Sequence, residues 1–212
     1  MVGRLLVSQF RTCISEPVPQ ILDAARYLDA AVTAHLQGKR GLAEELIRAA
    51  DMPEIYSWLK PIWAKSEAHL VAPLKHGQLA VPKELRVKAR MPTTEEKLKI
   101  HQRDGYSCRF CGMPVIRPEV RVGMARTYPA TVRWGRREAE QHSAFQAMWA
   151  QYDHVVPHAK GGTNDLENIV LACAACNFGR GGYSLEEVGV SDPRERSASR
   201  GSWDGLERFL RG

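Results

Sequence analysis

The sequence has no long hydrophobic run. Although 44% of its 212 residues are hydrophobic, every apolar run is far shorter than the roughly 20 residues that a membrane-spanning helix needs. The first seven residues lack the longer apolar region and the small-residue cleavage site of a secretory signal. The chain also has no internal repeat. We therefore expect a cytoplasmic protein without a membrane partner, folded as one large domain or two small ones.

Cysteine is scarce, with five residues in all. Four of them form two CxxC pairs, Cys108/Cys111 and Cys173/Cys176, and in a reducing compartment such pairs favour a metal over disulfides. The glycine and alanine between the paired cysteines disfavour the alternative of a redox dithiol. Four thiolates bind Zn²⁺ tetrahedrally and leave no open position, so the predicted zinc is structural. Cys13 is left over, and we expect a buried or partly buried thiol with no assigned role.

Charge is unevenly distributed along the chain. The net charge is +6, and residues 1–72 carry 8 Lys/Arg and 8 Asp/Glu, whereas residues 83–137 carry 14 Lys/Arg against 5 Asp/Glu. A basic stretch indicates a polyanionic partner, but basic residues also solvate an ordinary surface. Both interpretations of residues 83–137 stay open from charge alone.

The first part of the chain is predicted to be helical. Apolar residues recur at three- and four-residue spacing over 18–36, and further helices are expected at 41–50, 53–60 and around 62–71. Gly38 is the expected stop of the first helix, and Pro61 is expected to end or kink the third. With balanced charge, residues 1–72 form a candidate region for protein–protein contact, either a homodimer or docking to another protein. Residues 73–92 are predicted to be a basic linker.

The second part of the chain mixes predicted strands and helices over residues 93–190. Thr93 and Glu96 form a capping box that opens a helix to about Arg103. Within an insertion at 112–151, residues 112–133 are expected to be irregular or strand-like and 134–151 helical. Strands are expected at 152–157 and 169–171, with a loop at 160–165 between them and a short helix from Cys173. The tail, 191–212, is expected to pack back on the domain through residues 203–206.

Asp153, His154 and Asn177 are candidates for catalysis. A neutral imidazole accepts a proton from water near pH 7, and carboxylate and amide oxygens are ligands for Mg²⁺. In a regular strand, the side chains of Asp153 and His154 point to opposite faces, so a bulge or twist is expected if both serve one site. The zinc would tie Asn177 to the hairpin that carries the other two residues. This chemistry suits phosphodiester hydrolysis.

Two segments resemble the zinc-containing HNH endonucleases. Residues 103–111, Arg-Asp-Gly-Tyr-Ser-Cys-Arg-Phe-Cys, are similar to the start of that motif. Residues 153–177 are similar to the rest, with Asp-His-Val-Val-Pro, Gly-Gly-Thr-Asn-Asp-Leu-Glu-Asn and Cys-Ala-Ala-Cys-Asn. The resemblance implies an α+β chain with a ββα-metal core, stapled by a structural zinc on the four cysteines and joined to the N-terminal helical region.

The same resemblance implies roles for individual residues. His154 would be the general base of a DNA endonuclease, and Asp153 and Asn177 would hold Mg²⁺ or another divalent cation. Asn168 would brace the loop between the strands and orient the histidine. The third signature residue is Asn177 rather than histidine, a variant that also occurs in the family.

Several basic residues are candidates for nucleic-acid contact. The insertion is either a DNA-contacting arm or a helical buttress, and His158 either assists phosphate binding or lies on the loop surface. The set of candidates is Lys160, Arg180, Arg133, Arg136, Arg137 and His158. The alternative function is a non-catalytic, zinc-stapled nucleic-acid-binding module. DNA is the expected partner and RNA is left open, as are sequence specificity and the choice between nicking and double-strand cleavage.

Overall fold

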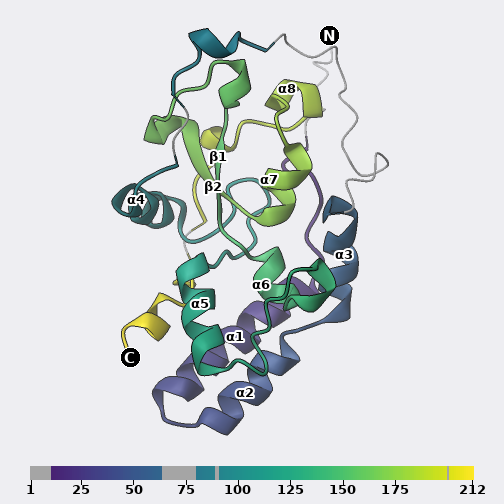
Figure 1. The fold of residues 1–212 in the computed structure, drawn as a ribbon, viewed down its shortest axis with the longest axis vertical. Helices are drawn as coiled ribbons and strands as arrows, with labels where there is room; N and C mark the ends of the chain where they lie inside the picture. The colour runs from purple at the N-terminus through teal and green to yellow at the C-terminus, as the bar shows by residue number, and fades with distance from the viewer. Residues whose placement is uncertain (1–10, 64–79, 89–90, 200) are drawn as a thin grey trace, which may run out of the picture.

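A computed structural model describes residues 11–63, 80–88, 91–199 and 201–212. Within them lie eight α-helices, a two-stranded antiparallel sheet and six short 3-10 turns. The helices and strands are α1 (Gln20–Leu36), α2 (Arg40–Ala49), α3 (Pro53–Trp63), α4 (Thr94–Asp104), α5 (Pro118–Thr127), α6 (Ser143–Ala147), β1 (Gln151–His154), β2 (Ile169–Ala172), α7 (Ala174–Arg180) and α8 (Leu185–Val188). The sheet and α7 occupy one half of the elongated molecule, and α1, α2, α5 and α6 the other (Figure 1).

The first three helices are confirmed close to their predicted bounds. Gly38, with a φ of 75°, separates α1 from α2, as expected for a residue in the left-handed region. Pro61 lies inside α3, which continues to Trp63 instead of ending at the proline. The further helix expected around 62–71 lies, beyond Trp63, outside the described residues.

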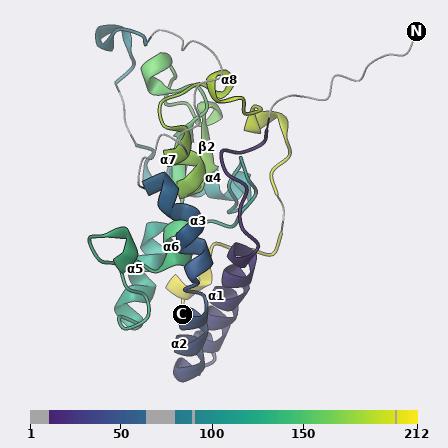
Figure 2. The same cartoon turned by 90° about the vertical axis from the view of Figure 1, so that its right-hand side faces the viewer.

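Helices α1–α3 share their hydrophobic core with the rest of the protein. Ile21, Leu28, Ile55 and Leu59 are fully buried and belong to one cluster with the buried residues of α6, β2 and α7. Helix α3 lies beside α6 and α7 (Figure 2). The N-terminal helical region is therefore packed on the sheet-bearing half of the molecule along the length of α3.

Helix α4 begins as the sequence predicts. The Thr93 hydroxyl accepts a hydrogen bond from the Glu96 amide at 3.3 Å, and the Glu96 carboxylate accepts one from the Thr93 amide at 2.7 Å. Both otherwise unpaired N–H groups at the helix start are thus satisfied. The helix ends at Asp104, within one residue of the predicted position.

The insertion differs from its prediction. Residues 118–127, expected to be irregular or strand-like, form α5, which starts at a proline in the first helical turn, where a missing N–H costs nothing. Residues 134–151, expected to be helical, contain one short α-helix, α6, after a 3-10 turn at Glu138–Glu140, because Gly135 and Glu140 close a turn through a 3.2 Å hydrogen bond. Strand-like pairing of Trp134 with Gln141 takes the place of the first helical turns.

The two strands form an antiparallel hairpin in which Gln151 is paired with Ala172 and His154 with Ile169. Helix α7 follows β2 directly and packs on β1. The expected α+β arrangement, two strands followed by a helix, is confirmed. A two-stranded hairpin is only marginally stable by itself, so its surroundings decide whether it forms.

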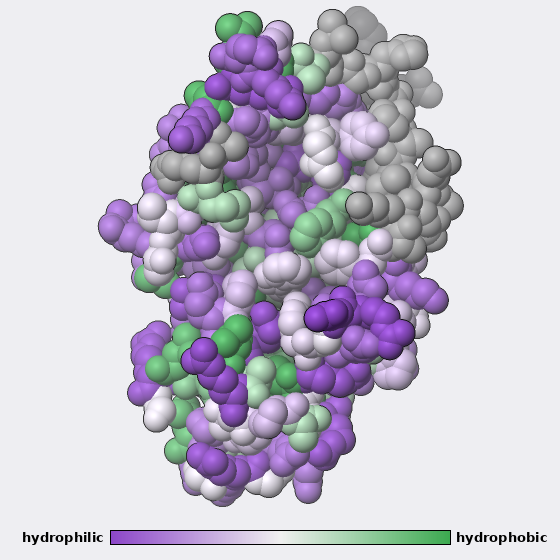
Figure 3. Space-filling view, viewed as in Figure 1, coloured by the Kyte–Doolittle hydropathy of each residue, from purple (hydrophilic) through white to green (hydrophobic). Residues whose placement is uncertain are grey.

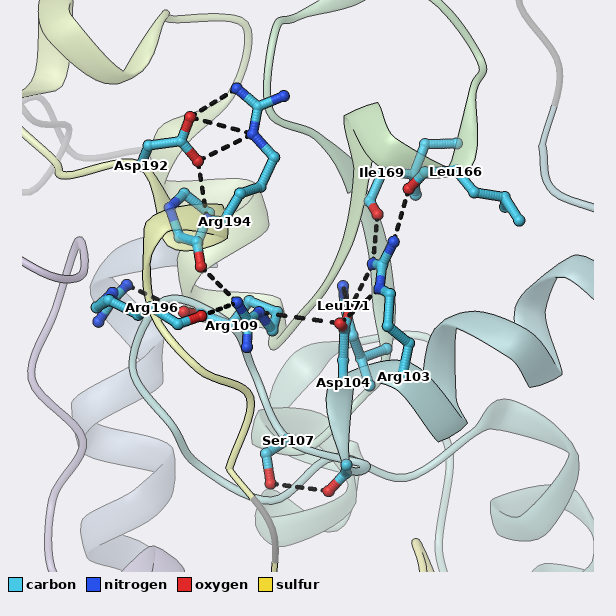
Figure 4. Close-up of polar contacts among 12 residues, drawn as sticks. Arg103, Asp104, Ser107, Arg109, Leu166, Ile169, Leu171, Asp192, Arg194 and Arg196 are labelled. Atoms are coloured by element: carbon cyan, nitrogen blue, oxygen red, sulfur yellow. Dashed lines mark hydrogen bonds and ion pairs between the residues drawn. The ribbon is translucent and has the colours of Figure 1, made fainter.

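The outer edge of β2 is covered by the segment that leads out of α4 (Figure 4). Arg103 donates to the Ile169 carbonyl at 2.6 Å, and the Leu171 amide donates to the Asp104 carboxylate at 2.8 Å. The Arg109 amide donates to the Leu171 carbonyl at 2.8 Å. Because these contacts satisfy the edge groups, β2 offers no row of free N–H and C=O groups there.

The tail packs on the domain as predicted. Leu206 is fully buried, and the Trp203 indole donates to the Val115 carbonyl at 3.2 Å. On the face drawn in Figure 3, hydrophobic residues show in small patches within a mostly hydrophilic surface. Among the described helices, none has the length and apolar composition needed to span a bilayer.

Candidate functional site

The four paired cysteines meet in one cluster. Their sulfur atoms all lie within 4.8 Å of one another, and the sulfurs of Cys111 and Cys173 are 3.7 Å apart. Zinc–sulfur bonds of about 2.3 Å in a tetrahedron place sulfurs about 3.8 Å apart, so the cluster fits Zn²⁺. Cys108, Cys173 and Cys176 are buried. Burial opposes ionisation of Cys108, but hydrogen bonds from the other thiols, Cys111 first, hold the pKa of its thiol below the ordinary value.

Two tight turns bring the sulfurs together. In the first, the Cys108 amide donates to the Met113 carbonyl at 2.9 Å, and the Gly112 amide donates to the Cys108 carbonyl at 2.8 Å. In the second, the Cys173 sulfur accepts a hydrogen bond from the Cys176 amide at 3.4 Å and caps α7. The cluster therefore fixes the N-terminal end of α7 against the segment that follows α4.

Asp153 is buried and paired with Arg180. The Arg180 Nε donates to Asp153 Oδ2 at 3.0 Å, and its Nη2 donates to Oδ1. Burial raises the pKa of the Asp153 carboxyl, and the guanidinium opposes that rise. A carboxylate has about four lone-pair positions, so a two-point contact with Arg180 leaves acceptor capacity for a cation.

Arg180 is placed differently from the surface phosphate contact that the sequence suggested. Its side chain is only 1% exposed. It also donates to the carbonyl oxygens of Val155 and Tyr183, both at 3.1 Å, and of His154 at 2.5 Å. The guanidinium therefore joins α7 to the end of β1 and is not presented on the surface.

His154 lies on the opposite face of β1 from Asp153. The register is regular at both positions, so the bulge expected from the sequence is absent from this described strand. His154 is half-buried, and its Nε2 lies 3.3 Å from Oδ1 of Asn164. Its ring centre is 6.5 Å from that of His158. His154 is the last residue of β1, at the start of the loop formed by residues 155–168.

Asn168 spans the loop that follows His154. Its Oδ1 accepts from the Val156 amide at 2.9 Å, and its Nδ2 donates to the carbonyls of Val156 at 3.1 Å and Thr163 at 2.9 Å. Gly162 fits against this amide because a Cβ there would overlap the Val156 carbonyl oxygen. The loop is thus drawn closed by one side chain.

Asn177 lies on α7, one turn before Arg180. Residues three apart share one face of a helix, so Asn177 faces the same side as the arginine that holds Asp153. Its side chain is half-buried and makes no hydrogen bond to the residues that the structure describes. Its amide group is therefore not committed to a partner among the described residues.

Most of the other predicted nucleic-acid contacts are engaged with acidic partners or with backbone. Lys160 pairs with Glu187 at 2.6 Å, and Arg133 pairs with Asp51 at 2.5 Å. Arg137 donates to Glu140 at 2.6 Å, whereas the Arg136 side chain is exposed. Surface ion pairs of this kind are weak, so Arg133 and Arg137 stay candidates for phosphate contact. Within the insertion, the Arg121 guanidinium stacks 3.8 Å above the Trp134 ring.

His158 faces a segment distant in sequence. Its Nε2 lies 2.5 Å from the Val87 carbonyl oxygen, so this nitrogen is not directed at solvent as a phosphate contact. Asn164 is the other residue whose environment sequence reasoning missed, because it reads only as part of a turn. Its Nδ2 donates to the Lys88 carbonyl at 2.9 Å. No local pattern signals contacts with a segment more than seventy residues earlier.

Comparison with known families identifies part of this site. Residues 140–181 match the family model described as HNH endonuclease, and the match includes β1, β2, α7 and the second cysteine pair. The chain therefore contains an HNH endonuclease domain. No curated protein and no solved structure matches the chain.

Proposed function

We propose that this chain, which contains an HNH endonuclease domain at residues 140–181, is a metal-dependent endonuclease that hydrolyses DNA phosphodiester bonds. HNH endonucleases act on nucleic acids in general. The main observation that supports this proposal is that Asn177 lies one helical turn from Arg180, which holds Asp153 at the end of β1. This arrangement supports Asp153 and Asn177 as a pair of oxygen ligands, with His154 the next residue after Asp153 and the last of the strand.

Asp153 and Asn177 would hold the divalent cation through a carboxylate and an amide oxygen. Such hard oxygen ligands suit Mg²⁺, which keeps several of its waters and therefore needs few protein ligands. When bound, the cation supplies stabilisation of the charge that develops on the scissile phosphate and on the leaving oxygen. The burial of Asp153 favours this role, because a desolvated carboxylate gains more from a nearby cation than a hydrated one.

His154 would act as the general base. An imidazole titrates near neutral pH and takes a proton from a water that attacks phosphorus. Its position at the end of β1 and at the start of the loop leaves the ring half-exposed. The ring is therefore accessible to a water and a substrate, while its backbone is fixed by the carbonyl contact to Arg180.

The four-cysteine cluster would serve this site as a structural support. Zn²⁺ at the N-terminal end of α7 and Arg180 at its C-terminal end together set where Asn177 lies relative to β1. Four thiolates leave no open coordination position, so the zinc would not take part in the reaction.

The test is cleavage of supercoiled plasmid DNA by zinc-loaded protein with Mg²⁺, compared between wild type and His154→Ala. We expect relaxed or linear product from wild type and a loss of about 10²- to 10⁴-fold in rate for the variant, the usual range for a general base. Thr163→Ala is the matched control, because Thr163 lies in the same loop and contacts only Asp165 with its hydroxyl. It should cut like wild type.

Two outcomes would contradict the proposal. Normal cleavage by His154→Ala would show that another group is the base. DNA binding without Mg²⁺-dependent cleavage by wild type of verified zinc content would favour the alternative of a non-catalytic nucleic-acid-binding module, for which the basic stretch 83–137 would be the binding surface. Parallel assays on single-stranded and double-stranded RNA separate the two nucleic acids.

A further inference from the structure

A basic segment from the first half of the chain lies along the loop that follows His154. We call residues 80–88 the strap. The Val81 amide donates to the Ala159 carbonyl at 2.9 Å, and His158 contacts the Val87 carbonyl at 2.5 Å. Asn164 donates to the Lys88 carbonyl at 2.9 Å. These contacts hold the strap on the loop through backbone groups.

The contact with Lys88 fixes which way the Asn164 amide points. The Lys88 carbonyl can only accept a hydrogen bond, so the NH₂ group of Asn164 must face it. The carbonyl oxygen of the same amide, Oδ1, then faces His154, with 3.3 Å between Oδ1 and Nε2. The usual ambiguity between the two ends of an asparagine amide is removed by the strap.

This orientation also fixes the proton on His154. Because Oδ1 can only accept, Nε2 must carry the hydrogen, and the lone pair of the neutral ring is on Nδ1. Nδ1 makes no hydrogen bond to the part of the chain that the structure describes. It is therefore the nitrogen that is free to accept a proton.

We propose that Asn164 is a positioning residue for His154, which holds the imidazole with hydrogen on Nε2 and the base lone pair on Nδ1, and that the Lys88 carbonyl holds Asn164 in turn. The proposal deepens the proposed function and rests on it for its catalytic consequence. The strap thus belongs to the active site instead of being only a linker. Partners that set the tautomer and ring orientation of a functional histidine commonly change activity by about 10- to 100-fold.

Two substitutions separate positioning from a merely structural role. Asn164→Leu is similar in size but has no acceptor, and Asn164→Asp keeps an acceptor toward Nε2. We expect kcat to fall by about 10- to 100-fold in Asn164→Leu with little change in KM. It should recover only in part in Asn164→Asp, because aspartate restores the acceptor toward Nε2 but has no N–H group for the Lys88 carbonyl.

Thr163→Asp is the matched control for charge. It places a carboxylate one residue away, on an exposed side chain that does not contact His154. Its kcat should stay close to that of wild type. A fall in kcat as large as that of Asn164→Leu would show that any change in this loop disturbs the site, and would overturn the positioning argument.

A readout independent of cleavage is the Nε2 proton of His154 in isotope-labelled full-length protein, observed by NMR. We expect a slowly exchanging Nε2–H resonance in wild type and Asn164→Asp and its loss in Asn164→Leu. Its absence from wild type, or its persistence in Asn164→Leu, would overturn the proposal. A protected Nε2–H in a wild-type protein that cuts no nucleic acid would instead retain the positioning and reject the proposed function.

Discussion

The two ends of the β1–β2 hairpin are held in different ways. At the end where Gln151 pairs with Ala172, the zinc end, the strands run into the four-cysteine cluster and the buried backbone contacts along β2. At the end where His154 pairs with Ile169, the loop end, single side chains and the strap hold the loop 155–168. The four-cysteine cluster lies at one end, and the candidate base, whose side chain is half-buried, lies at the other.

This contrast indicates a division of tasks within a small sheet. The zinc end supplies the stability that a two-stranded hairpin lacks by itself. The loop end can then keep a half-exposed histidine, and α7 an Asn177 side chain that has no hydrogen-bond partner among the described residues, without unfolding. Substitutions at the zinc end should therefore change stability first, and those at the loop end should change cleavage with smaller effects on stability.

Loss of the zinc should have the largest effect. Structural zinc contributes about 10–16 kcal/mol to small zinc domains, which exceeds the whole free energy of unfolding of many proteins. We expect Cys176→Ser to lose bound zinc and the cooperative thermal transition, measured by metal analysis and circular dichroism. Cys13→Ser is the control, because Cys13 is buried but lies outside the cluster. If Cys176→Ser kept the melting temperature of wild type, the zinc end would not be the main source of stability, and the contrast between the two ends would be wrong.

Replacing Arg180 should have the next largest effect, because this residue links α7 to the loop end. Arg180→Met leaves the Asp153 carboxylate buried and unpaired, which typically costs about 3–5 kcal/mol. Denaturant unfolding measures the change in the free energy of unfolding. Arg194→Met is the control, since its pair with Asp192 is 43% exposed on the arginine side and should cost less than about 1 kcal/mol. Equal losses in the two variants would contradict the structural role of Arg180.

The two ends should also differ in their response to acid. At the zinc end, burial lowers the pKa of His101 to about 3. The unfolded chain binds this proton near pH 6.5, whereas the folded protein binds it only near pH 3. The free energy of unfolding therefore decreases as the pH is lowered from about 6.5 toward about 3. The slope is at most about 1.4 kcal/mol per pH unit. His101→Phe should reduce the loss of stability between about pH 7 and about pH 5.5, as measured by denaturant unfolding at both pH values.

The corresponding group near the loop end responds only in stronger acid. Burial opposes ionisation of Glu187, but hydrogen bonds from Lys160 and Ser184 lower the pKa of its carboxyl to about 2. The ionised carboxylate stabilises the folded protein fully above pH 4.5, the pKa of this group in the unfolded chain. This stabilisation is lost as the pH falls toward about 2. Glu187→Gln should therefore leave the change between about pH 7 and about pH 5.5 as it is in wild type. If Glu187→Gln lost less stability than wild type between about pH 7 and about pH 5.5, Glu187 would contribute to the mild-acid response, and the assignment of that response to His101 would be wrong.

Replacing Asn168 should cost less stability than replacing Cys176 or Arg180. Asn168→Ala removes three hydrogen bonds within the loop, and leaving buried groups unpaired costs about 1–3 kcal/mol. Hydrogen exchange should quicken at the Val156 amide, which loses its acceptor, while the Leu171 amide at the edge of β2 keeps its protection. Faster exchange at both amides would mean that the two ends unfold together.

Features that depend on near neighbours in sequence could be predicted. Strand-like residue runs and the turn signals at 160–165 predicted both strands and the loop between them, although the first strand ends at His154, three residues before its predicted end. The CxxC spacing predicted the cluster. The capping box at Thr93 gave the start of α4. The insertion was predicted wrongly because its turn closes between Gly135 and Glu140 in the middle of an apparently amphipathic stretch.

Features that depend on distant partners could not be predicted. Arg180 was read as a surface cation because its buried partner Asp153 lies 27 residues earlier. The hydrogen bond from Asn164 to the Lys88 carbonyl in the strap joins residues 76 positions apart, and no sequence pattern in either segment predicts it. Residue type predicts the chemistry of a side chain, whereas the fold decides whether that chemistry is turned toward solvent or toward the protein.

The packing of α3 on α7 has a consequence for how the HNH domain could be exchanged or redesigned. Trp63 lies 5.0 Å from Phe178 between ring centres, and a Cβ at Gly179 would come within 2.8 Å of Ile14 and 3.3 Å of Ile62. The helix that carries Asn177 and Arg180 thus has its outer side shaped by the N-terminal region. Domain shuffling that joined residues 93–190 to a foreign N-terminal partner would need a matching aromatic and aliphatic surface at Phe178 and Gly179. The two parts of the chain are therefore expected to be inherited and engineered as a pair.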